Sequence, residues 1–123
     1  MIKTIQIATF AAIAAFAIAT PADAHPQLMS AGPAPGSVVK TAPKAIRIQF
    51  NEAVVANFSG VDLTDEHGKK LGTGAASLAA NDKKQLIVPV SGDLTPGKYT
   101  VQWHAVGDDT HRVEGKFNFE FKP

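Results

Sequence analysis

The sequence has 123 residues, no cysteine, and 12 basic against 11 acidic side chains, which leaves a formal net charge of +1. This length fits one small domain. The lack of cysteine excludes a domain held together by disulfides, and the balanced charge lacks the basic excess that is typical of nucleic-acid binding. We therefore expect one domain that is stabilised by its own hydrophobic core and has no nucleic-acid partner.

The beginning of the chain has the pattern of a secretory signal peptide. An apolar run from Ile5 to Ile18 follows a lysine, and Ala22-Asp23-Ala24 offers the small residues that a signal peptidase needs. The run is shorter than the about 20 residues that a membrane span needs, so we favour a cleaved signal peptide over an uncleaved membrane anchor. We therefore expect that the mature chain is not stably inserted in the membrane. We predict a signal peptide over residues 1–24 and a mature domain over residues 25–123.

The mature part is expected to be all-β. In Ile46–Phe50 the apolar and polar side chains alternate, which places them on opposite faces of a strand, and helical periodicity is absent. Similar runs separated by glycine and proline follow at residues 61–63, 86–90, 99–106 and 117–121. The region from Gly72 to Asn81 is interpreted as a loop or a weak edge strand. About seven short strands in a domain of this size predict an immunoglobulin-like β-sandwich.

Four single side chains carry expectations of their own. Trp103 shares a predicted strand face with Tyr99, so it is expected to belong to the core rather than to stack on a ligand. Met29 is expected to fill space in the core. His67, in a turn, and His104, on the strand face opposite Trp103, are expected to be exposed without a metal role.

The predicted cleavage makes His25 the candidate for a metal site. As a first residue it offers both its α-amine and its imidazole Nδ1, which can bind one metal ion together. Pro26 has no amide hydrogen that a metal could displace, so the remaining ligands must come from elsewhere in the fold. Asp109 and His111 are candidates, because side chains two residues apart point to the same side if the segment is extended. Taken alone, these two residues also suit a capped turn and a solvated histidine.

The four donors indicate copper. Two nitrogens from His25, one from His111 and one oxygen from Asp109 suit tetragonal Cu(II), whereas Zn(II) prefers a tetrahedral arrangement. Without a thiolate, a blue-copper electron-transfer site is excluded. Because the nitrogens must be unprotonated to coordinate, affinity is expected to fall below about pH 6 to 7.

The chain resembles the CopC family of periplasmic copper-resistance proteins. The resemblance spans the mature domain and rests on these motifs: His25-Pro26 after the Ala-x-Ala site, Pro35-x-Ser37-Val38, Ile46-x-Ile48-x-Phe50-x-Glu52, Leu94-Thr95-Pro96-Gly97-x-Tyr99, Trp103-x-Ala105-Val106, and Asp109-Thr110-His111-x-x-x-Gly115.

This resemblance implies a small Greek-key sandwich and a Cu(II) site formed by His25, Asp109 and His111. It also implies that Glu52 is an axial ligand or a neighbour that orients a ligand or the amine. Some members have a second site for Cu(I), built from methionines and a histidine. The corresponding segment 61–68 keeps His67 but has no methionine, so a Cu(II)-only member is implied.

The expected function is therefore that of a periplasmic Cu(II)-binding protein without enzymatic activity. It would sequester copper or pass it to an inner-membrane partner, which the resemblance implies is of the CopD type. Two alternatives remain open. One is a small copper-dependent oxidase or monooxygenase with a histidine-brace site, and the other is a metal-free immunoglobulin-like adhesion module.

Overall fold

The computed structural model describes residues 25–123, so the predicted signal peptide lies outside the described residues. Within this range no helix is long and apolar enough to cross a membrane. The described part contains one short 3₁₀ helix, Ala56–Phe58, and nine strands. The strands are β1 (Leu28–Gly32), β2 (Val38–Val39), β3 (Ala45–Phe50), β4 (Gly60–Asp65), β5 (Lys70–Leu71), β6 (Ser77–Ala79), β7 (Asp82–Pro89), β8 (Gly97–Val106) and β9 (Arg112–Phe121).

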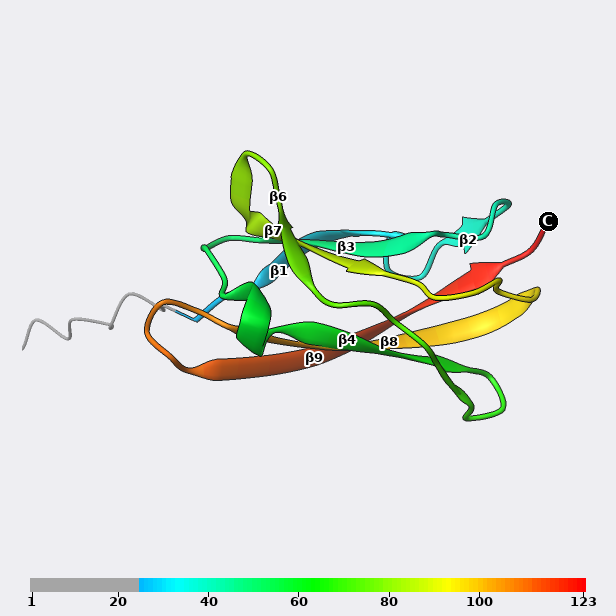
Figure 1. Ribbon diagram of the computed structural model, residues 1–123. Helices are drawn as coiled ribbons and strands as arrows, with labels where there is room; N and C mark the ends of the chain where they lie inside the picture. The colour runs from blue at the N-terminus through cyan, green and yellow to red at the C-terminus, as the bar shows by residue number, and fades with distance from the viewer. Residues whose placement is uncertain (1–24) are drawn as a thin grey trace, which may run out of the picture.

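The strands form two sheets that pack face to face (Figure 1). One sheet has the order β1-β3-β7-β6 and the other has the order β2-β9-β8-β4-β5. The chain crosses repeatedly from one sheet to the other, as in a Greek-key sandwich, so the predicted fold class is confirmed. The described part has nine strands rather than about seven, and the stretch from Gly72 to Asn81 does contain an edge strand, β6.

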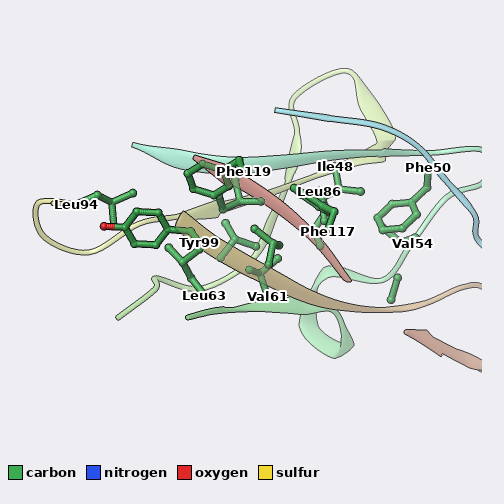
Figure 2. Packing of buried hydrophobic residues seen from close by; sticks show 14 residues of the cluster. Ile48, Phe50, Val54, Val61, Leu63, Leu86, Leu94, Tyr99, Phe117 and Phe119 are labelled. Atoms are coloured by element: carbon green, nitrogen blue, oxygen red, sulfur yellow. The ribbon is translucent and has the colours of Figure 1, made fainter. Parts of the chain in front are cut away.

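The hydrophobic core fills the space between the two sheets (Figure 2). In β3 the side chains of Ile46, Ile48 and Phe50 are buried, whereas Arg47 points to solvent, as the alternation predicts. Fully burying one such apolar side chain contributes about 1.5–3 kcal/mol. The domain therefore has the core that a chain without disulfides requires, made by these residues: Ile46, Ile48, Phe50, Val54, Val61, Leu63, Leu86, Val88, Leu94, Tyr99, Val101, Ala105, Phe117 and Phe119.

Trp103 packs against the rim of this core. Its ring meets Phe50 edge-on at a centroid distance of 5.4 Å, and its indole covers Gly115 so closely that a Cβ there would lie 2.5 Å from Cζ2. The expected packing role of Trp103 is thus confirmed. The expectation for Met29 is wrong, because its side chain is 64% exposed. The pairing of β1 with β3 shifts register between Leu28 and Ser30, and this irregularity turns Met29 outward on an edge strand.

The longest strand pair fixes the place of the predicted site. β8 and β9 pair in an antiparallel fashion from Gly97 opposite Phe121 to Val106 opposite Arg112. The loop that joins them, residues 107–111, lies at one end of the sandwich, beside the start of the described chain, while the C-terminus lies at the other end (Figure 1).

Candidate metal centre

Three of the four predicted ligands come together at this end of the sandwich. His25, Asp109 and His111 each offer one ligand atom, and these atoms all lie within 4.8 Å of one another. Asp109 Oδ2 is 3.6 Å from His25 Nδ1 and 3.2 Å from His111 Nδ1. The two imidazole rings lie at a centroid distance of 5.1 Å, with their planes tilted by 48°. The fold therefore gathers two nitrogen donors and one oxygen donor from distant parts of the sequence.

The loop between β8 and β9 positions two of these side chains. The amide of Thr110 donates a hydrogen bond to the carbonyl of Gly107 at 3.0 Å, and the amide of His111 donates to Asp109 Oδ1 at 3.2 Å. The backbone of Thr110 has a positive φ of 67°. The segment is thus a tight turn, so the extended conformation under which residues two apart would share a side is not the one observed. Asp109 and His111 face the same point because the turn folds one beside the other.

The first described residues are held against this loop by Pro26. The proline is buried, and a Cβ at Gly107 would lie only 3.1 Å from Pro26 Cγ. Further along, the amide of Gln27 donates to Asn51 Oδ1 at 2.7 Å, and the amide of Asn51 donates to the carbonyl of Gln27 at 3.1 Å. These contacts place His25 next to Asp109. The sequence prediction did not include Asn51 or Gly107.

Glu52 lies outside the group of three. It lines a shallow hollow of about 380 Å³ that Asp108 and Asp109 also line, so it is a neighbour of the loop. Its role as an axial ligand or as a residue that orients a ligand stays a prediction.

The chemistry of the three side chains suits a divalent transition metal. Imidazole nitrogens with a carboxylate oxygen form a set that copper and zinc accept, whereas a hard ion such as Mg²⁺ prefers oxygen donors alone. The two carboxylate oxygens of Asp109 have different partners: Oδ1 accepts a hydrogen bond from the amide of His111, and Oδ2 lies close to both imidazoles. All three side chains are solvent-accessible, the carboxylate of Asp109 least at 27%, so an ion can reach them from outside.

The other two histidines lie outside the site. His67 is exposed in the turn after β4, as expected. His104 is half-buried rather than exposed, because its ring lies over Gly60 on the outer face of the sheet. This burial, together with the positive charge of Arg112, lowers the pKa of His104 below its ordinary value of 6.5, although the carboxylates of Asp62 and Glu114 act in the opposite direction.

Comparison with known proteins places these features in a family. The family model described as the CopC domain matches residues 28–122. Protein YobA of Escherichia coli K12 is 40% identical over 99 residues, which cover 80% of each chain. Copper resistance protein C of Pseudomonas syringae pv. tomato is 39% identical over 107 residues, which cover 82% of this chain and 83% of the relative.

Two kinds of relative extend this comparison. The crystal structure of CopC from Methylosinus trichosporium OB3b is 28% identical, with a TM-score of 0.74 over 80% of this chain and 95% of that chain. The structure of PcoC, described as a methionine-rich copper resistance protein from Escherichia coli, is 33% identical, with a TM-score of 0.72 over 80% of this chain and 100% of that chain. Copper transport protein CutJ of Bacillus subtilis is 27% identical over 96 residues, which are 78% of this chain but 18% of CutJ. The matched family model and the relatives that share most of its length show that this chain belongs to the CopC family.

Proposed function

We propose that the mature protein binds Cu(II) in the periplasm as a copper-resistance protein and has no enzymatic activity. The observation that carries this proposal is the convergence of His25, Asp109 and His111 at one end of the sandwich. Relatives named copper resistance protein C support the copper role. The ion is the cargo of the protein, which either sequesters it or passes it to a partner.

The donor atoms support Cu(II) over Cu(I). Nitrogen and oxygen ligands suit Cu(II), whereas Cu(I) prefers soft sulfur ligands. PcoC is described as methionine-rich, but this sequence has two methionines, of which Met1 belongs to the predicted signal peptide. Met29 alone does not form a thioether site.

The proposed site needs signal peptide cleavage before His25. Cleavage at that position would supply the α-amine as a fourth donor beside the imidazole of the same residue. The amine, two imidazoles and one carboxylate would then form a four-donor set of the kind that tetragonal Cu(II) accepts. Glu52, on the neighbouring hollow, would orient the amine or occupy an axial position.

We further propose a CopD-type inner-membrane protein as the acceptor of the copper. CutJ supports a partnership of this kind, because it is named a copper transport protein and its matching region forms only 18% of its length. A domain that is tethered to the remainder of a larger chain in one protein can meet a separate partner in another.

The histidine-brace alternative is less well supported. An oxidase or monooxygenase needs an open position on the copper for oxygen. Here Asp109 Oδ2 lies 3.6 Å and 3.2 Å from the two imidazoles, which favours a carboxylate in that position. Peroxide formation by the copper-loaded protein with a reductant would revive the enzyme hypothesis.

The decisive experiment compares two forms of the domain in a competition titration for Cu(II). One form begins at His25 and the other carries one additional alanine before it. We expect much weaker binding by the extended form, because its α-amine and the His25 imidazole no longer share one residue. Mass spectrometry of the exported protein should give His25 as the first residue. Equal affinity of the two forms would remove the amine from the ligand set.

A further inference from the structure

The pairing of Gln27 with Asn51, two residues from His25 in the sequence, depends on a side chain. Asn51 directly follows β3, and Gln27 directly precedes β1, so the two residues face each other just beyond the end of the β1–β3 ladder. In a regular antiparallel ladder every second pair of facing residues exchanges two backbone hydrogen bonds. Here the amide of Asn51 donates to the carbonyl of Gln27 at 3.1 Å, but the amide of Gln27 donates to the side-chain Oδ1 of Asn51 at 2.7 Å.

The backbone of Asn51 turns away from β1 at this point, because the chain leaves the sheet toward Val54. Val54 then pairs with Gly107, and the amide of Val55 donates to the carbonyl of Val106 at 2.8 Å. The side-chain oxygen Oδ1 of Asn51 therefore takes the place of the backbone carbonyl of Asn51 as the acceptor for the amide of Gln27. The short segment from Asn51 to Val55 thus contacts both Gln27, close to His25, and the base of the β8–β9 loop.

A second contact holds the residues that follow His25 against the β8–β9 loop. The buried ring of Pro26 lies against Gly107, where a Cβ would approach Pro26 Cγ at 3.1 Å, Pro26 Cδ at 3.2 Å and Asp109 Oδ1 at 3.2 Å. Gly107 leaves room for the proline and for the carboxylate of Asp109 at once. The position of His25 relative to Asp109 is therefore fixed by close neighbours in the sequence: Pro26 and Gln27 after His25, and Gly107 two residues before Asp109.

We propose that Asn51 is a positioning residue for the metal site, acting on His25 through the backbone of Gln27. This inference rests on the proposed function. Chain ends are poorly ordered unless they are tied down, and after the proposed cleavage only His25 and Pro26 precede the Asn51–Gln27 pair. When the side-chain acceptor is lost, His25 samples positions away from Asp109 and His111, and the copper ion loses its bidentate ligand for part of the time.

The test uses the domain that begins at His25, with the variants N51A and N51D. An ordinary hydrogen bond of this kind corresponds to a factor of about 2 to 12 in an equilibrium constant. We expect N51A to weaken Cu(II) binding by about that factor and to speed copper release to a chelator. N51D retains the acceptor oxygen and should restore binding to near the wild-type value. The electron paramagnetic resonance spectrum of copper-loaded N51A should contain a second species with fewer nitrogen ligands.

Asp65 offers a matched control. Its Oδ1 accepts backbone amides of His67 at 2.9 Å and Lys69 at 2.8 Å in the turn between β4 and β5, at the opposite end of the sandwich (Figure 1). D65A removes the same kind of hydrogen bond and should leave copper affinity and the spectrum unchanged. If N51A and D65A bind copper as the wild type does, Asn51 has no positioning role.

A second variant keeps the inference testable if N51A does not fold. G107A retains every hydrogen bond of the pair, but its Cβ crowds both Pro26 and Asp109 Oδ1, and it should weaken copper binding and alter the spectrum. G74A is its control, because a Cβ at Gly74 would meet Pro89 at a similar distance of 3.3 Å far from the proposed ligands. Normal binding by G107A would contradict the inference. A wild-type domain without Cu(II) affinity would instead overturn the proposed function.

Discussion

At the scale of single residues, Thr110 departs from the local rules of the chain. It is the non-glycine residue with a positive φ within residues 25–123, at 67°, and it stands between two proposed ligands. A β-branched side chain rarely adopts this conformation, whereas glycine and asparagine adopt it readily. Such departures are expected at functional sites, where the surrounding structure holds the backbone in place.

We expect T110N to stabilise the metal-free domain. Asparagine removes part of a conformational cost of about 1 kcal/mol without the added chain entropy of glycine. The midpoint of thermal unfolding should rise by about 4–8 °C per kcal/mol, measured by circular dichroism in a chelator. Copper affinity should stay within about twofold, because the turn keeps its shape.

The matched control is T41N, since Thr41 is an exposed loop residue with an ordinary negative φ. It should leave the midpoint unchanged. A lower midpoint in T110N would mean that contacts of the threonine outweigh the strain of its backbone.

His104 makes the stability of the domain dependent on pH. Burial and the charge of Arg112 lower its pKa in the folded state, so the unfolded chain, with an ordinary pKa of about 6.5, takes up the proton first. The free energy of unfolding should therefore fall as the pH decreases through 6.5 and should stop falling, for this residue, below the folded-state pKa. H104Q removes this contribution. Urea unfolding of the metal-free protein at pH 7.5 and pH 5 should show a smaller loss of stability in H104Q than in the wild type.

The exposed turn residue His67 provides the comparison, and H67Q should lose as much stability on acidification as the wild type. Equal losses in H104Q and H67Q would show that His104 does not contribute to the pH dependence.

At the scale of elements, the alternation of apolar residues predicts the strands that bury one face. β3 and the second half of β9 follow that pattern, because Ile46, Ile48, Phe117 and Phe119 all point into the core. β2 and β5 have two residues each, and they exist because β9 and β4 offer partners to their backbones. Two residues carry no periodicity, so pattern analysis could not detect these strands.

The site was only partly accessible from the sequence for a similar reason. Residue type and spacing led to His25, Asp109 and His111, but the geometry that joins Asp109 to His111 is a turn with a positive φ at Thr110. Asn51 could not be identified, because its acceptor role arises only from where β3 ends opposite Gln27. Tertiary pairing, rather than local sequence, decides such contacts.

At the scale of the whole molecule, the proposed site connects the predicted mature N-terminus, His25, to the β8–β9 loop. These parts meet only in the folded domain, so unfolding separates His25 from Asp109 and His111. Copper binding should therefore be coupled to folding, whereas a metal-free adhesion module would show no such coupling.

We accordingly expect Cu(II) to raise the thermal midpoint of the domain that begins at His25. A ligand at 100 times its dissociation constant stabilises the native state by about 2.7 kcal/mol, which corresponds to a shift of roughly 10–20 °C for a domain of this size. Differential scanning fluorimetry at pH 7.5 should show this shift in the wild type and in H67A, and most of it should disappear in D109A and H111A. At pH 5 the shift should shrink, because protons compete with copper for the amine and imidazole nitrogens. A full shift in H111A would place the copper elsewhere, and its absence from the wild type would favour the metal-free module.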